Sequence, residues 1–90
     1  MEDTSPTEAA PTEHDALLRK RLAANVRALR TQANLTLKQA AERAELHWRH
    51  WQKVEAAETN ATMLTLSRLA DALNVDPVDL LRAESPAKKR

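Results

Sequence analysis

The spacing of the apolar residues constrains the fold of this chain more than any other feature. In the first apolar stretch they recur at intervals of four, four and three positions, at Leu18, Leu22, Val26 and Leu29. This period places them on one face of a helix, which we expect to run from about Asp15 to Thr31 and to end in a turn at Asn34. No stretch carries a strand signal. The pattern therefore predicts an all-α fold.

The next two helices are predicted from capping and spacing. Thr36 and Gln39 have the spacing of a capping box, in which the hydroxyl accepts a hydrogen bond from the third helical amide and the Gln side chain bonds back to the cap. We therefore expect a second helix to begin at Thr36, with a thin inner face of alanines. A third helix is expected over about His47 to Ala56, with Trp51 and Val54 facing the core.

Two more helices are expected towards the C-terminal end. Thr62 is a suitable cap for the fourth, and Asn74 is a suitable stop. Asp76 followed by Pro77 supplies a cap with proline at the first helical position, which predicts a short fifth helix ending with Leu81. The inner stripe of the fourth helix is expected to comprise Met63, Leu66, Leu69, Ala70 and Leu73. We therefore expect a compact domain of five helices.

The composition limits the size of the domain and its chemistry. The chain has 90 residues, enough for one small domain, and its core must be aliphatic because it has two Trp and no Phe or Tyr. The absence of Cys excludes disulfides and thiolate zinc sites, and the absence of Gly excludes glycine-rich phosphate loops. No apolar run has the length of a membrane span or a signal peptide. We therefore expect a soluble cytoplasmic protein with no membrane partner, metal or cofactor.

Residues for catalysis or metal binding do not form a recognisable pattern. His47 and His50 have an i, i+3 spacing compatible with a metal ion, but no Cys and no nearby carboxylate completes a site. The serines have no evident His and Asp partners, and no pair of carboxylates stands out for acid–base catalysis. We therefore expect a protein that is not an enzyme.

The charge of the chain is distributed unevenly. Residues 1–15 contain five Asp and Glu and no Lys or Arg, whereas residues 16–53 contain nine Lys and Arg against two Glu. We expect a disordered acidic arm over residues 1–14, one domain over residues 15–83 and a flexible basic tail over residues 84–90. The basic segment, with a net charge of +7, either attracts a polyanion or merely solvates helix faces, and composition alone does not decide between the two.

Two segments carry a resemblance to a known family. In LTLKQAAERAELHWRHWQKVE, residues 35–55, a small residue stands at Ala41 and an apolar residue follows the turn at Leu46. The segment LTLSRLADALNVDPVDLL, residues 64–81, has the spacing of a closing helix and a short last helix. Over Leu22 to Leu81 the chain resembles the helix-turn-helix domain of the phage repressor, Cro and Xre-like regulators. The resemblance implies a five-helix repressor-like DNA-binding domain whose second and third helices form the helix-turn-helix.

The resemblance also implies a function and the residues that carry it. It implies a sequence-specific transcriptional regulator that reads the major groove of duplex DNA with the third helix, usually as a homodimer. It further implies a structural salt bridge between Arg30 and Glu55. The base-facing residues it implies are Trp48, Arg49, Gln52 and Lys53. The residues expected to contact phosphates are Arg19, Arg21, Lys38 and His47.

The chain departs from the family pattern around the predicted helix-turn-helix. Glu45 stands in the turn where Gly is usual, and Ala57 replaces a later Gly. Leu37 stands where the family often has a Gln that binds a phosphate, and His47 replaces the Ser or Thr that caps the recognition helix. These departures keep a second function open. In it, the same scaffold is a protein–protein interaction module, antitoxin-like or co-regulator-like, that binds a partner through the Trp48 face.

Overall fold

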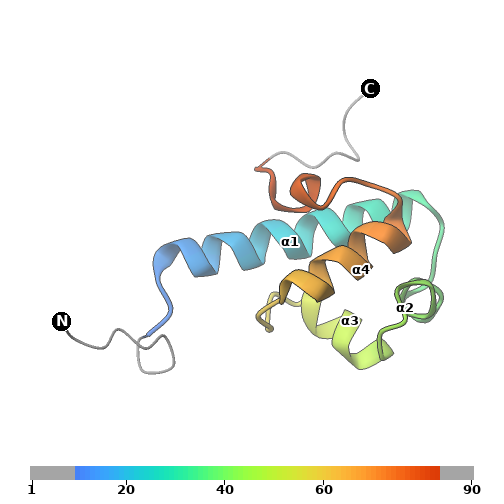
Figure 1. Cartoon of the computed structure of the whole chain (residues 1–90), viewed down its shortest axis with the longest axis horizontal. Coiled ribbons are helices and arrows are strands. Elements are labelled where there is room, and N and C mark those ends of the chain that lie inside the picture. Colours follow the sequence, from blue (N-terminus) through green and yellow to red (C-terminus); the bar gives the residue numbers. More distant parts are fainter. Residues whose placement is uncertain (1–9, 84–90) are drawn as a thin grey trace.

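The computed structural model describes residues 10–83, which form a bundle of helices without strands (Figure 1). Four α-helices are followed by one short 3-10 helix: α1 over Glu13–Gln32, α2 over Leu37–Ala44, α3 over Trp48–Glu55, α4 over Met63–Leu73 and η2 over Pro77–Leu81. None of these helices is long and apolar enough to cross a membrane. The all-α prediction is confirmed for the described residues. Residues 1–9 of the expected arm and all of the expected tail lie outside them.

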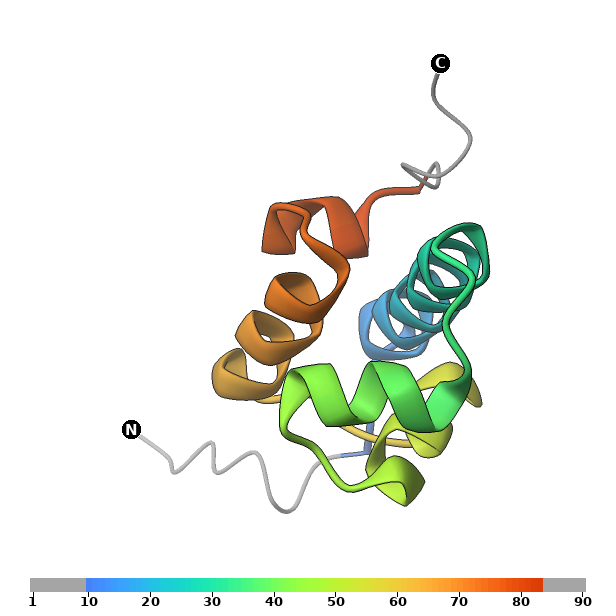
Figure 2. The same ribbon diagram turned by 90° about the vertical axis from the view of Figure 1, so that its right-hand side faces the viewer.

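Helix α1 runs along the length of the molecule, and the other elements are arranged around it. It contacts α3, α4 and η2, while α2 packs against α3 and α4. In both views η2 lies on one side of the bundle and α2 and α3 lie on the other (Figures 1 and 2). The core where they meet comprises Leu22, Val26, Leu29, Ala40, Ala41, Ala44, Trp51, Val54, Leu69, Ala70, Ala72 and Leu80. This core is aliphatic except for one tryptophan, as the composition predicts.

Each helix begins at a residue whose side chain accepts a hydrogen bond from a nearby backbone amide. The predicted capping box is present: Thr36 Oγ1 accepts from the Gln39 amide at 3.1 Å, and Gln39 Oε1 accepts from the Thr36 amide at 2.9 Å. His47 caps α3 through Nδ1, which lies 3.1 Å from the amide nitrogen of Arg49. The remaining helices are capped by Thr12, Thr62 and Asp76. These caps confirm the predicted starts of the second, fourth and fifth helices.

The chain leaves each of its four α-helices through a residue in the left-handed backbone conformation, without using glycine. These residues are Asn34 (φ 59°), Glu45 (φ 58°), Ala57 (φ 61°) and Asn74 (φ 59°). The conformation costs roughly 1–2 kcal/mol for a residue with a Cβ atom, and asparagine tolerates it best. The turn predicted at Asn34 and the stop predicted at Asn74 are confirmed. Glu45 adopts this conformation in the turn before α3, where glycine is usual in the family that the sequence resembles.

The structure corrects the expected start of α1 and two members of the predicted inner stripes. Helix α1 begins at Glu13 rather than Asp15, because Thr12 Oγ1 accepts from the Asp15 amide at 3.1 Å and caps the helix earlier. Leu18 is 42% exposed and Met63 is 82% exposed. The first turns of α1 extend beyond the other helices (Figure 1), so Leu18 is only partly covered. Met63 is the first residue of α4, where side chains point back past the start of the helix.

The fifth element is a 3-10 helix rather than the expected α-helix. Its last carbonyls are bound by a side chain of α1: Asn25 Nδ2 lies 2.9 Å from the oxygen of Leu80, 3.0 Å from that of Arg82 and 3.3 Å from that of Asp79. A longer α-helix would need these carbonyls for its own hydrogen bonds. Asn25 is buried, and its role was not predicted from the sequence. A polar residue beside the apolar stripe of α1 is the signal that points to it.

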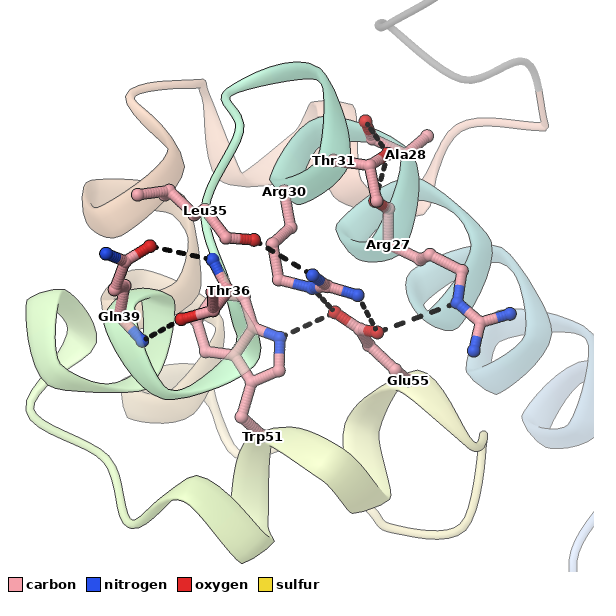
Figure 3. Close-up of polar contacts among 9 residues, drawn as sticks. All are labelled: Arg27, Ala28, Arg30, Thr31, Leu35, Thr36, Gln39, Trp51 and Glu55. Atoms are coloured by element: carbon pink, nitrogen blue, oxygen red, sulfur yellow. Dashed lines mark hydrogen bonds and ion pairs between the residues drawn. The ribbon is translucent and has the colours of Figure 1, made fainter.

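The predicted pair of Arg30 and Glu55 is present and joins α3 to α1 (Figure 3). Arg30 donates twice to the carboxylate, from Nε to Oε2 at 2.6 Å and from Nη2 to Oε1 at 3.0 Å. The indole Nε1 of Trp51 donates to Oε2 of Glu55 at 2.7 Å, and Arg27 Nε lies 3.6 Å from Oε1. Arg30 also donates through Nη1 to the carbonyl oxygen of Leu35 at 2.9 Å. One guanidinium thus connects α1 with α3 and with the segment that leads into α2.

The carboxylate at the centre of this network is charged although it is buried. The Glu55 side chain is 4% exposed. Burial alone would raise the pKa of Glu55, but hydrogen bonds from Arg30 and Trp51 and the charges of Arg30 and Arg27 outweigh it, so the pKa lies below its ordinary value. The hydrogen bond to Glu55 in turn raises the pKa of Arg30, against a smaller opposing effect of burial.

The two tryptophans are expected to differ in their contribution to stability. Trp51 is 0% exposed, so Trp51→Ala should cost about 3–5 kcal/mol and leave a domain of this size largely unfolded. Trp48→Ala should cost clearly less, because Trp48 is only half-buried. Urea unfolding followed by circular dichroism compares the two variants. An equal loss of stability would contradict the assignment of Trp51 as the inward-facing tryptophan.

Arg30 and Glu55 are expected to be coupled energetically. Removing one partner leaves the other charge buried, which costs about 3–5 kcal/mol, whereas removing both costs less than the sum of the single changes. The free energies of unfolding of Arg30→Met, Glu55→Gln and the double variant measure this coupling. If the single effects simply added, the ion pair would not be what holds α3 on α1.

The lowered pKa of Glu55 predicts a loss of stability in acid. Its contribution is present above the unfolded-state pKa of about 4.3 and is lost as the pH falls through the lower folded-state value. The free energy of unfolding should therefore decrease as the pH falls below about 4.3, and part of this decrease should be missing in Glu55→Gln. Urea unfolding of both proteins across this acid range measures the difference. Identical slopes in the two proteins would contradict the prediction.

Candidate functional site

Helix α3 has a buried face and an exposed face. Trp51 and Val54 lie in the core, whereas Arg49, Gln52 and Lys53 are exposed. This division follows from the period of 3.6 residues per turn, which sends neighbouring side chains to different sides of the helix. The carboxylate network anchors the inner face to α1, and it thereby fixes the direction in which the outer face points.

The turn between α2 and α3 is held by contacts from both of its sides. Glu45 reverses the chain in its left-handed conformation, and the amide of Leu46 donates to the carbonyl oxygen of Ala41 at 2.9 Å. The carboxylate of Glu45 accepts a hydrogen bond from Arg68 of α4 at 3.1 Å. The acidic residue of the turn is therefore paired with α4. No local pattern pointed to Arg68, because its partner lies 23 positions away.

Trp48 is the centre of a cationic cluster at the first turn of α3. Lys38 of α2 places Nζ 5.5 Å from the centroid of the Trp48 ring, and Arg49 places its guanidinium carbon 5.3 Å from it. Both distances lie within the range of cation–π interactions. The ring of His47 stacks against Trp48, with centroids 5.8 Å apart and an interplanar angle of 26°. Helices α2 and α3 therefore meet at this ring.

The residues expected to face bases share one helix and one surface. Arg49 and Lys53 line a surface hollow of about 420 Å³, together with His47, His50 and Thr59. Gln52 is exposed on the same helix, and Trp48 is half-buried at its start and packs against the core. Among residues 10–83, the ion pairs include none of Lys38, Arg49 and Lys53. The cationic charge of this surface is therefore not neutralised within the described part of the chain.

Two of the four expected phosphate-binding residues belong to the Trp48 cluster. Lys38 is exposed in the first turn of α2, and His47 is exposed at the cap of α3. Because Nδ1 of His47 accepts a hydrogen bond, the proton of the neutral ring is on Nε2, which is free to donate. Leu37, which stands where the family often has Gln, packs against the core. The first turn of α2 therefore offers a lysine to an anion.

The other two expected phosphate-binding residues lie on α1. Arg19 is engaged within the protein: its Nε lies 3.1 Å from Oδ2 of Asp15, and its Nη2 donates to Oδ1 of Asn60 at 2.6 Å. These contacts tie the first half of α1 to the loop that follows α3. Arg21 is half-buried on the same helix. The structure thus gives Arg19 a structural partner, and it places neither arginine in the Trp48 cluster.

The expected absence of a metal site is not contradicted. Residues 10–83 contain no group of three or more His, Cys, Asp or Glu that is placed to hold a metal ion. His47 and His50 share the hollow on α3 with Arg49 and Lys53, whose charges disfavour a bound cation. The surface therefore suits an anion rather than a cation.

Comparison with solved structures places this geometry among bacterial regulators. The restriction-modification controller protein C.AhdI from Aeromonas hydrophila is similar with a TM-score of 0.66 and 26% identity, covering 69% of this chain and 94% of its own. The clp gene regulator ClgR from Corynebacterium glutamicum gives a TM-score of 0.67 and 25% identity, covering 71% and 68%. The hypothetical transcription factor NHTF from Neisseria gives a TM-score of 0.71 and 26% identity, covering 82% and 84%.

The sequence itself was compared with curated proteins and with family models. No curated protein matches it significantly. A family model described as a helix-turn-helix domain matches residues 21–83, which include α2, the turn at Glu45 and α3. Because this match spans well over half of the chain, the protein belongs to the helix-turn-helix domain family.

Proposed function

We propose that this protein is a sequence-specific transcriptional regulator that binds duplex DNA and reads the major groove with α3. The observation that carries the proposal is the cationic face formed by Lys38 of α2 and by Arg49 and Lys53 of α3, all exposed. The helix-turn-helix family and the three regulators of similar structure support a DNA-binding transcriptional regulator. A polyanion is the partner that such a face attracts.

The shape of α3 is compatible with this role. An α-helix with its side chains is about 10–12 Å across, and the major groove of B-DNA is about 12 Å wide. The helix has eight residues, and its inner face is fixed by the core and by the Glu55 network. The outer side chains therefore approach the bases from a rigid support, which lowers the cost of ordering them on binding.

Each exposed side chain of α3 suits a particular base edge. Arg49 is suited to a bidentate contact with O6 and N7 of guanine, and Gln52 to N6 and N7 of adenine. Lys53, four residues after Arg49, is suited to a guanine further along the groove. Trp48 adds an apolar edge that suits a thymine methyl group. We propose phosphate contacts for Lys38, His47, Arg19 and Arg21, those of Arg19 requiring release from Asp15 or Asn60.

We further propose that the protein binds DNA as a homodimer. Leu64 of α4 and Val78 of η2 are each 61% exposed, and Leu81 of η2 is half-buried. Large exposed apolar side chains support an association surface. These residues lie on elements other than α2 and α3, so association through them leaves α3 available. Dimers of this class place two recognition helices about 34 Å apart, one turn of the duplex.

Partner binding through the Trp48 face, the other function expected for this scaffold, is not favoured by the geometry. An interface anchor needs a large aromatic surface free to enter a pocket. Trp48 is half-buried, and Lys38, Arg49 and His47 lie around its ring. The proposed function involves no catalytic step and no cofactor.

Salt dependence and two substitutions test the proposal on a duplex selected from a random pool. Three of the four proposed phosphate contacts come from Lys or Arg (Lys38, Arg19 and Arg21), and three such contacts in each protomer of a dimer give a slope of log affinity against log salt of about −5. Arg49→Ala should lose about 1–3 kcal/mol of discrimination at one base step. Lys38→Ala should weaken all duplexes evenly and make the slope shallower by about 0.9 per protomer. Mobility-shift titrations at several salt concentrations measure all three quantities.

Arg82→Ala is the matched control for these substitutions. Arg82 is a cation that follows η2. Figures 1 and 2 show η2 on the side of the bundle opposite α2 and α3. Its removal should leave the affinity, the slope and the base preference nearly unchanged. The proposed function would be overturned if the protein bound no duplex at low salt while its circular dichroism showed that it was helical.

A further inference from the structure

We propose that Trp48 is a positioning residue: its ring holds Lys38 of α2 and Arg49 of α3 in one arrangement before DNA arrives. Lys38 is the proposed phosphate contact and Arg49 the proposed guanine contact, so the inference rests on the proposed function. It deepens that function because one side chain, Trp48, then influences both the affinity for DNA, through Lys38, and the base specificity, through Arg49.

The ring is fixed, and the cations gather around it. Trp48 packs against the core, so its orientation is set by the fold rather than by solvent. Lys38 Nζ lies 5.5 Å from the ring centroid and the Arg49 guanidinium carbon 5.3 Å from it. Glu42 stands one turn after Lys38 on α2, yet no ion pair among the described residues joins the two. Lys38 therefore lies over the ring rather than beside the nearest carboxylate of its own helix.

This arrangement has a physical reason. Two like charges from different helices repel one another, and a surface without a compensating group would let both side chains spread into solvent. The negative face of the indole ring attracts both cations, most strongly among the aromatic side chains. The stacked ring of His47 covers a further part of Trp48 and narrows the space around it. The ring thus restricts the rotamers of two long side chains at once.

Holding the side chains of Lys38 and Arg49 before binding lowers the conformational entropy that DNA binding costs. Lysine and arginine lose much rotamer freedom when they are immobilised, and a side chain already held near its bound position loses less. Placing Lys38 and Arg49 is therefore a contribution of Trp48 in addition to the thymine contact proposed above.

The arrangement in the free protein is tested first, by nuclear magnetic resonance. Trp48→Leu keeps an apolar side chain for packing and removes the ring, while Trp48→Phe keeps a weaker ring. In the wild type the terminal methylene protons of Lys38 and Arg49 should be shifted upfield by the ring current. The shifts should be lost in Trp48→Leu and partly kept in Trp48→Phe. Wild-type shifts typical of solvated side chains would overturn the inference whether or not DNA is bound.

The effect on DNA binding is tested with a selected duplex and its guanine-substituted partner. Trp48→Leu should weaken binding to both duplexes through Lys38 and reduce discrimination between them through Arg49, each by about 2- to 12-fold. Trp48→Phe should restore most of both effects. In a Lys38→Met background, the general loss of affinity caused by Trp48→Leu should disappear while the loss of discrimination remains. Circular dichroism and urea unfolding establish that each variant is folded under the binding conditions.

The outcomes separate this inference from the function on which it rests. Wild-type protein that binds no duplex overturns the proposed function, and the proposed role of Trp48 in binding falls with it. Wild-type protein that binds, with Trp48→Leu equally strong and equally selective, overturns only the positioning role. Tighter binding by Trp48→Leu would also overturn it, because it would mean that the ring withholds the cations from DNA. If Trp48→Leu caused the same general loss of affinity with Lys38 present and with Lys38 replaced, the coupling between Trp48 and Lys38 would be contradicted.

Discussion

A carboxylate removed from water is stable only when other donors replace its hydration, and Glu55 receives these donors from two helices. Arg30 of α1 binds both carboxylate oxygens, and the indole of Trp51 binds one of them from within α3. Because the same guanidinium reaches the carbonyl of Leu35, the approach to α2 is held as well. The relative placement of α1, α2 and α3 thus depends on one satisfied charge in a small, mostly aliphatic core.

The two tryptophans of α3 make different contacts. They are three residues apart, on the same side of the helix, and they differ because Trp48 stands at its first turn while Trp51 stands further inside the bundle. Trp51 is fully buried and uses its N–H group on the Glu55 carboxylate. Trp48 lies at the edge of the core and uses its π face on two cations. The first residue joins α3 to the carboxylate network, and the second contacts one cation from α2 and one from α3.

Much of the fold was predictable because its signals are local. The capping box at Thr36, the turn at Asn34 and the stop at Asn74 depend on side chains that act within a few residues. The bonds that hold the end of η2 were not predictable, since they come from Asn25, more than fifty positions away. The exposure of Leu18 was missed because periodicity identifies a face of a helix but not how far the neighbouring helices extend along it.

Two features around the candidate site were predictable from the family resemblance: one ion pair and the exposed face of α3. The family resemblance implied the pair of Arg30 and Glu55, and the structure contains it. It also placed Arg49, Gln52 and Lys53 on the outer face of α3, where they are exposed. The hydrogen bond of Arg19 to Asn60 was not foreseen. Sequence spacing reports which residues share a helix face, whereas this bond depends on the loop that folds against α1.

The left-handed exits of the four helices have a consequence for how this sequence can change. In a chain without glycine, Asn34, Glu45, Ala57 and Asn74 carry conformations that a residue lacking a Cβ atom would adopt without steric conflict. Ala57 has no side-chain hydrogen bond to lose, so a glycine there would release about 1 kcal/mol of strain. Glu45 differs, because its carboxylate is bonded to Arg68. A single substitution at the exit of α3 would therefore stabilise the fold, and this gain could offset destabilising changes on the exposed face of the same helix.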